Sequence, residues 1–250
     1  MTELRDMYRA IPFFTRYWLT FTVGLSLIAR FGLLNYRYLI LDYYGFVSRF
    51  QIWRPITALF YYPIGPSTGF HFLINCYFLY SYSQRLESGV FMGKPADYCY
   101  MLMFNWALCL IIALLIDLPI LMDPMVLSVL YVWCQLNKDV IVNFWFGSRF
   151  KAMYLPWVLF LFNLIINGGG VTELLGILVG HVSFFLLFQY PQEFGGPALL
   201  TPPAFLKQIF PDTRYVGGFG TAPQQQVPTR PAGTMFGGHN WGRGQTLGGN

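Results

Sequence analysis

The sequence predicts an all-α membrane protein with six transmembrane helices and a polar C-terminal tail. Hydrophobic residues make up 55% of the 250 residues and charged residues only 11%, whereas about 25% of a typical soluble domain is charged. The chain also changes character at Pro191, after which Gly, Pro and Gln replace long aromatic and aliphatic runs. We therefore predict a membrane domain over residues 1–190 and a disordered cytosolic tail over residues 191–250.

Six apolar segments supply the predicted helices. A helix needs about 20 residues to cross a bilayer squarely, and several of these segments are shorter. Because their number is even, both termini are expected on the same side of the membrane. The segments are Tyr17–Leu34, Phe70–Ser83, Tyr98–Ile116, Leu121–Leu136, Tyr154–Ile166 and Leu174–Tyr190.

The distribution of Lys and Arg indicates that both termini lie in the cytosol. With the N-terminus in the cytosol, the loops near Asp117–Asp123 and Asn167–Glu173 face away from it and carry no basic residue. Only the first loop departs from the positive-inside rule, since it contains Arg37, Arg49 and Arg54. We expect these arginines at the membrane interface, where long basic side chains can snorkel.

Four further segments are expected near the membrane surface. Thr2–Ala10 has the pattern of a short amphipathic helix. The first loop, Asn35–Gly69, is rich in aromatic residues that favour the headgroup region, so its helices are placed in the outer interface. Asn137–Lys151 fits a cytosolic interfacial connection, and Pro203–Phe210 fits a surface-binding stretch within the tail.

The last apolar segment contains a G-x-x-x-G pair, Gly176 and Gly180. Two small residues on one helix face allow a neighbouring helix to approach closely. We interpret the pair as a packing feature.

A serine and two histidines in the apolar segments raise the possibility of an intramembrane serine protease. His71 and Asn75 share one face of the second helix, Ser128 lies in the fourth and His181 in the sixth. In such an enzyme the serine attacks, a histidine takes its proton and polar donors hold the oxyanion. However, bulky aliphatic residues flank the serine within Val126–Leu130, which favours a serine that bonds back to its own helix.

The other polar features do not indicate an active site. Asp117, Asp123 and Glu173 lie near segment ends and are interpreted as solvated loop edges. The G-x-S-x-G match at Gly65–Gly69 is rejected because that motif requires a preceding strand. No cofactor or metal is expected. A small-solute transporter remains an alternative, although polar residues are sparse and no inverted repeat is visible.

The first loop resembles the signature of the Derlin family, which belongs to the rhomboid superfamily. The resemblance rests on Phe50–Thr57, in which Trp53 and Arg54 match the rhomboid W-R motif. It implies a six-helix rhomboid-like fold for the membrane domain. Further similar strings are Tyr77–Tyr80, Pro95–Tyr98, Leu130–Trp133 and Phe144–Gly147.

The rhomboid catalytic positions are only partly retained. His71 and Asn75 resemble the H-x-x-x-N of the second rhomboid helix, and His181 falls where the sixth-helix histidine would be. The rhomboid G-x-S-G is missing around Ser128. The resemblance therefore implies a pseudoprotease with vestigial rhomboid positions rather than an enzyme.

The tail carries a second resemblance at residues 240–248. This stretch is similar to the SHP box, a short motif that binds the N-terminal domain of the AAA ATPase known as valosin-containing protein. An aromatic anchor, glycines and an apolar anchor suit recognition of an extended segment. The residues expected to bind are Trp241, Gly242, Gly244, Gln245, Leu247 and Gly248.

Together the resemblances imply a role in endoplasmic-reticulum-associated degradation, within protein quality control and the unfolded protein response. The protein would lie in the endoplasmic reticulum membrane and help retrotranslocate misfolded clients to the cytosol for ubiquitin-dependent degradation. The implied partners are the ATPase, a membrane-embedded ubiquitin ligase complex, client proteins, membrane lipid and further copies or relatives of this chain, but no nucleic acid. The alternatives are an active rhomboid-type protease and a small-solute transporter.

Overall fold

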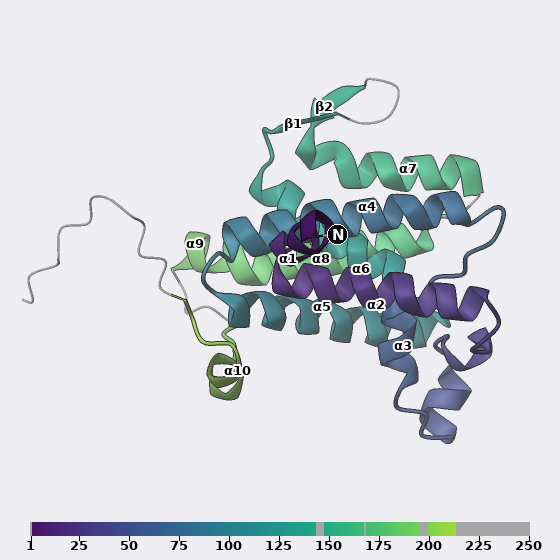
Figure 1. The fold of residues 1–250 in the computed structure, drawn as a ribbon. Coiled ribbons are helices and arrows are strands. Elements are labelled where there is room, and N and C mark those ends of the chain that lie inside the picture. Colours follow the sequence, from purple (N-terminus) through teal and green to yellow (C-terminus); the bar gives the residue numbers. More distant parts are fainter. Residues whose placement is uncertain (1, 144–147, 168, 196–199, 214–250) are drawn as a thin grey trace, which may run out of the picture. The chain divides into compact units, whose positions relative to one another are not determined.

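The computed structural model describes residues 2–143, 148–167, 169–195 and 200–213. Within these ranges the chain is mostly helical (Figure 1). The predicted strings at 144–147 and 240–248 lie outside them. The helices are α1 Thr2–Ala10, α2 Phe13–Arg30, α3 Arg54–Phe60, α4 Gly69–Arg85, α5 Pro95–Ile116, α6 Met122–Leu136, α7 Leu155–Asn167, α8 Val171–Phe184, α9 Tyr190–Phe194 and α10 Ala204–Ile209. Short helical turns lie at Tyr36–Tyr38, Tyr44–Ser48, Leu86–Val90, Ala152–Tyr154 and Phe185–Gln189.

A helix is present at each of the six predicted apolar segments, namely α2, α4, α5, α6, α7 and α8. The local sequence explains the ends of α5. Pro95 occupies its first position, where the missing N–H costs nothing, and Asp117 ends it in the left-handed conformation with φ of 57°. The helical part of the predicted fold class is therefore confirmed.

Two helical stretches are long and apolar enough to cross a membrane. They are Pro95–Ile116 and Val171–Glu193, the second of which continues from α8 into α9. Met122–Leu136 and Ala152–Ile165 are shorter apolar helices. The arrangement of six membrane-spanning helices stays a prediction.

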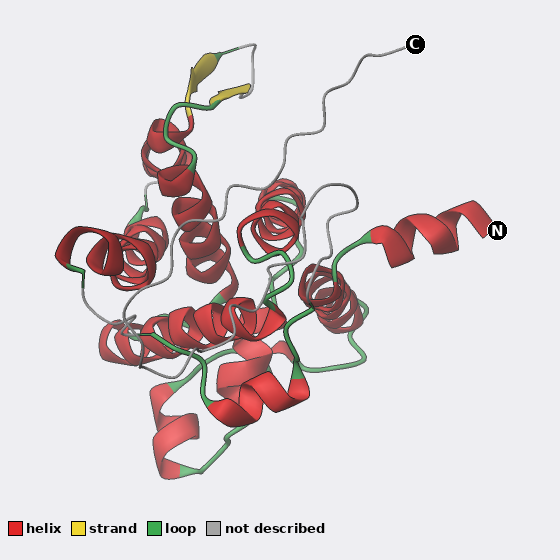
Figure 2. Ribbon diagram, turned by 90° about the vertical axis from the view of Figure 1, so that its left-hand side faces the viewer, coloured by secondary structure: helices red, strands yellow, loops and turns green. Residues whose placement is uncertain are grey.

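The prediction of an all-α chain is wrong in one place, because a short hairpin precedes α7 (yellow in Figure 2). Strand β1, Ile141–Asn143, pairs antiparallel with β2, Arg149–Lys151, with Val142 opposite Phe150. The β-branched residues at 141 and 142 favour a strand, and Val142 points into the core with 8% exposure. Three-residue strands carry too little sequence pattern to be recognised in a mixed, partly charged segment.

Helix α10 packs on the helical body, although sequence analysis assigned its residues to the tail. Leu206 of α10 is 4% exposed, and α10 packs against α5. The Phe210 ring lies 5.0 Å from that of Phe14, and the backbone N–H of Thr213 donates to the carbonyl of Gly93 at 3.0 Å. The described structure therefore continues beyond residue 190, since Leu206 and Phe210 give this short segment apolar side chains to pack against the body.

Helix α6 forms the centre of the packing. It contacts α4, α5, α7 and α8, and nearly all of its residues from Met122 to Cys134 are buried. The glycine pair of α8 faces it. A Cβ atom at Gly176 would lie 2.8 Å from the carbonyl oxygen of Pro124, and one at Gly180 would lie 2.8 Å from that of Ser128. The backbones of α6 and α8 therefore approach more closely than larger residues would allow.

The first loop folds around a buried arginine. Arg54, at the start of α3, is 8% exposed. Its Nη1 donates to the carbonyl oxygens of Arg37 at 2.9 Å and Ile40 at 2.8 Å, and its Nε donates to Gln51. The expectation that Arg54 snorkels at the interface is therefore wrong, because its planar group is occupied by protein acceptors. The neighbouring Trp53 is 47% exposed.

Candidate functional site

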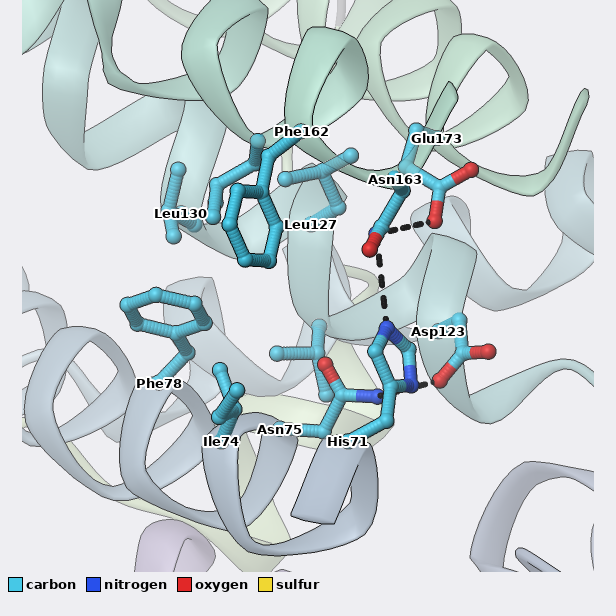
Figure 3. Close-up of a pocket in the computed structure, with 12 residues that line it drawn as sticks. His71, Ile74, Asn75, Phe78, Asp123, Leu127, Leu130, Phe162, Asn163 and Glu173 are labelled. Atoms are coloured by element: carbon cyan, nitrogen blue, oxygen red, sulfur yellow. Dashed lines mark hydrogen bonds between the residues drawn. The ribbon is translucent and has the colours of Figure 1, made fainter. Parts of the chain in front are cut away.

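A cavity of about 40 Å³ lies among α4, α6, α7 and α8 (Figure 3). Five polar side chains, which we call the cavity cluster, gather on one side of it: His71, Asn75, Asp123, Asn163 and Glu173. Apolar side chains line the other side, so the cavity is amphipathic. Among these are Ile74, Phe78, Leu127, Leu130 and Phe162.

Hydrogen bonds connect the cavity cluster across four helices. The Asn75 amide donates to Asp123 Oδ1 at 2.5 Å, and the Asn163 amide donates to Glu173 Oε1 at 2.6 Å. His71 lies between the two asparagines, with Nδ1 3.2 Å from the Asn75 amide nitrogen and Nε2 3.3 Å from that of Asn163. Each asparagine thus connects the imidazole to one carboxylate.

The polar side of the cavity is also reached from a more open hollow. This hollow has a volume of about 200 Å³ and shares His71, Asp123, Asn163 and Glu173 with the cavity. Tyr62, which also lines it, has its hydroxyl 2.6 Å from His71 Nδ1. A polar group can therefore approach the cavity cluster without crossing the apolar lining.

Helix ends place the two carboxylates. Asp123 lies in the first turn of α6 and Glu173 in the first turn of α8, where the free N–H groups of a helix favour negative charge. The interpretation of Glu173 as a solvated loop edge is wrong, because it is 8% exposed. Asp123 faces Asn75 rather than open loop, whereas Asp117 is exposed as expected.

The predicted serine belongs to a separate, sealed group of polar residues. Ser128 is fully buried, and its Oγ donates to the carbonyl oxygen of Met125 at 2.7 Å. The Asn105 amide donates to the same Oγ at 3.1 Å, and Ser183 donates to Asn105 Oδ1. We call Asn105, Ser128 and Ser183 the Ser128 cluster. The bond to Met125 is the one expected of a serine that bonds back to its own helix.

The predicted histidines have partners other than this serine. His181 is exposed, and its Nδ1 lies 2.9 Å from the hydroxyl of Tyr131. His71 lies in the cavity cluster instead. Ser128 therefore forms no hydrogen bond with a histidine in the part of the chain that the structure describes, and the arrangement of a nucleophile beside its base is not formed there.

The structure adds residues that sequence analysis did not select. Asn163 and Glu173 join His71 and Asn75 at the cavity, while Asn105 and Ser183 surround Ser128. Each is a single polar residue within or beside an apolar run, and such residues were a signal that sequence analysis could have used. No group of three or more His, Cys, Asp or Glu residues could hold a metal ion within the described ranges.

The cavity can bind a polar group on one side and an apolar group on the other. Its polar side offers two carboxylates, two amides and an imidazole, but no serine, threonine or cysteine lines it.

Comparison with known proteins gives similarity over the whole chain. The profile of the Der1-like family matches residues 11–204. A protein named Derlin-1 from Homo sapiens is 52% identical over 249 residues, which cover 99% of each chain. Proteins of the same name from Caenorhabditis elegans and Drosophila melanogaster are 48% identical over 250 residues and 49% identical over 244 residues. They cover 99% and 97% of this chain, and 100% and 98% of their own lengths.

The family match covers most of the chain, and the relatives are similar over nearly their full length. Both findings agree with the resemblance in the first loop and in the helices. This membrane protein belongs to the Der1-like family of Derlin proteins.

Proposed function

We propose that this protein is a non-catalytic component of endoplasmic-reticulum-associated degradation that helps move misfolded proteins to the cytosol. The observation that carries the proposal is full-length similarity to Derlin-1 proteins, at 52% identity for the human relative. The amphipathic cavity adds a physical reason, because a membrane protein that handles polypeptides needs a place for polar groups within an apolar setting.

In this proposal the six helices α2, α4, α5, α6, α7 and α8 cross the endoplasmic reticulum membrane, with both termini in the cytosol. Helices α6 and α7 have 15 and 13 residues, so they extend over only about 20 Å at 1.5 Å per residue. The apolar core of a bilayer is about 30 Å thick. Short helices thin the surrounding bilayer, and a thinner bilayer lowers the cost of moving a polar chain across it.

The absence of catalysis is supported by the surroundings of Ser128. Its hydroxyl is fully buried and bonded to Met125 and Asn105, and the flanking residues are bulky aliphatics rather than glycine. A serine-reactive probe should therefore leave Ser128 unlabelled, and His181→Ala should leave client degradation unchanged.

The proposed motor is the AAA ATPase valosin-containing protein, recruited through residues 240–248. The support is the sequence of the motif behind a Derlin-type body. A membrane-embedded ubiquitin ligase complex and further copies or relatives of this chain complete the proposed assembly.

The test is binding of the full-length protein, in detergent or nanodiscs, to the N-terminal domain of the ATPase. Trp241→Ala should weaken binding by tenfold or more, because a buried aromatic anchor contributes at least about 1.4 kcal/mol. Gln225→Ala, which lies in the same tail outside the motif, should bind normally. Equal binding by wild type and Trp241→Ala would remove the ATPase from the proposal and leave the protease and transporter hypotheses to be tested.

A further inference from the structure

We propose that the cavity cluster is a binding subsite for the ammonium group of a lysine carried on an apolar segment of a client protein. The inference rests on the proposed function, since it names the kind of polypeptide that the cavity prefers.

The charge of the cavity is the first argument. Asp123 and Glu173 both line it, and none of the residues lining it is Lys or Arg. Neither carboxylate forms an ion pair with a basic residue of the described chain. The ion pair seen there joins Asp139 and Lys151, which lie outside the cavity. Glu173 is buried and Asp123 is half-buried, and carboxylates removed from water without a cation are costly. A cationic ligand would supply the missing charge.

Unused hydrogen-bond acceptors are the second argument. An ammonium group has three N–H donors and no acceptor. Asp123 accepts from Asn75 through Oδ1 alone within the described residues, which leaves its Oδ2 open. Glu173 accepts one bond at each oxygen, from Asn163 and Thr172, whereas a carboxylate can accept about four. The cavity cluster therefore has acceptors for an ammonium group after its internal bonds are made.

The shape of the cavity favours lysine over arginine. A volume of about 40 Å³ exceeds the roughly 10–15 Å³ that one water-sized group needs, but it suits a compact ammonium better than a planar guanidinium. The apolar side, formed in part by Phe78 and Phe162, would cover the methylene stem (Figure 3). A lysine side chain has the matching form, an apolar methylene stem that ends in a charged ammonium group.

Polar access explains how a charge could reach this position. The hollow beside the cavity carries Tyr62 and Thr172 as well as the shared polar residues. His71, the other titratable side chain that lines the cavity, is engaged with Tyr62 and the two asparagines. As the ammonium enters, the polar groups of the hollow would replace its water molecules one after another. It would therefore never be surrounded by apolar side chains alone.

The experiment uses the full-length protein in phosphatidylcholine nanodiscs and an apolar membrane-spanning peptide. The peptide carries a photoreactive leucine next to one central residue, which is lysine, norleucine, arginine or glutamate. We expect the lysine peptide to crosslink about tenfold more than the norleucine peptide, which corresponds to about 1.4 kcal/mol. The arginine peptide should fall between them, and the glutamate peptide should not exceed norleucine.

Isosteric variants separate charge from folding. In the double variant Asp123→Asn, Glu173→Gln, the crosslinking yield of the lysine peptide should fall to that of the norleucine peptide. The crosslinking yield of the norleucine peptide should stay unchanged. Asp139→Asn makes the same chemical change at an exposed carboxylate outside the cavity, and it should keep the preference for lysine. Thermal unfolding of each variant checks that the fold is retained.

The client subsite would be overturned by equal crosslinking of lysine and norleucine peptides to wild type, or by a lysine preference that survives in the double variant. Competition by phosphatidylethanolamine, whose headgroup also carries an ammonium, would assign the site to lipid and overturn the client proposal. None of these three measurements depends on the ATPase. Trp241→Ala should keep the lysine preference, so a failure of recruitment and a failure of this subsite are distinguishable.

Discussion

Two groups of polar residues lie along helix α6, and they differ in charge and enclosure. The Ser128 cluster is neutral and fully buried, and its members hydrogen-bond one another. The cavity cluster contains two carboxylates, surrounds an open volume and lacks a cation within the described residues. A satisfied neutral cluster holds helices together, whereas a charged cluster at a cavity keeps capacity for a ligand. Of the rhomboid positions, His71 and Asn75 belong to the cavity cluster and Ser128 to the Ser128 cluster, whereas His181 lies outside both and pairs with Tyr131, so resemblance alone does not assign their roles.

The largest expected effect is at the interface that supports both clusters. Gly176→Val places side-chain atoms against Leu127 Cβ and Pro124 O, because each of these atoms lies 2.8 Å from the point that a Cβ at residue 176 would occupy. Since a backbone oxygen cannot move aside, we expect a loss of about 3 kcal/mol or more in the free energy of unfolding. Gly24→Val is the matched control, since nothing lies within 4 Å of its Cβ position. Normal degradation with Gly176→Val would show that close packing here is dispensable.

Within the Ser128 cluster, Asn105→Ala should destabilise the protein by about 2–4 kcal/mol. The change removes the donor to Ser128 and leaves the Ser183 hydroxyl without its acceptor. Ser128→Ala should cost about 1–3 kcal/mol, because the helix itself still satisfies the Met125 carbonyl but the buried Asn105 amide loses its acceptor. Chemical unfolding in detergent measures both. A large loss of client degradation by Ser128→Ala at unchanged stability would contradict the structural role of this cluster.

The cavity cluster should respond in the opposite way. Asp123→Asn or Glu173→Gln should leave stability unchanged or raise it by about 1 kcal/mol, because a carboxylate without a cation is removed from a half-buried or buried position and each amide oxygen can still accept from its asparagine. Client binding should fall at the same time. The same unfolding assay, run beside peptide crosslinking, checks this prediction. A large destabilisation would show that the carboxylates are structural, as in the Ser128 cluster.

The smallest effect is expected at the hairpin. The Lys151 ammonium, 2.9 Å from Asp139, lowers the pKa of that exposed carboxyl below its ordinary value. Because the pKa of Asp139 is lower in the folded than in the unfolded protein, the ion pair stabilises the hairpin fully above the unfolded pKa of about 4. This stabilisation is lost as pH falls through the folded pKa. The protection of the hairpin amides, measured as the ratio of intrinsic to observed exchange rate, should therefore fall only in acid, and Asp139→Asn should remove this dependence with no measurable change in the global unfolding midpoint.

The helices could be predicted from the sequence because each long apolar run needs internal backbone hydrogen bonds. The structure agrees for all six segments, with ends that differ by a few residues. The two strands and α10 were missed, since segments of three and six residues carry little periodicity. The strands and α10 are positioned by tertiary contacts, such as the burial of Val142 and Leu206 against neighbouring helices.

The candidate site could be predicted only in part. His71 and Asn75 are visible as a pair because they lie one turn apart on α4. Asn163 is 92 residues from His71, and Glu173 resembles a loop edge in the sequence, so neither was selected. The expectation that the Arg54 side chain snorkels failed for a related reason, because two of its acceptors lie 14 and 17 residues away.

The sequence by itself determined the helical segments and, through the first loop and the helix strings, the family. These features are local, since hydropathy, proline and glycine positions and short motifs act within a few residues of the chain. Only the tertiary structure decided which polar side chains meet, because the packing of α4, α5, α7 and α8 around α6 brings together residues from different helices, some into a sealed cluster and others at a cavity with two carboxylates. Burial and pairing of a charge depend on residues that are far apart in sequence, so function at the cavity could not be inferred from composition or spacing.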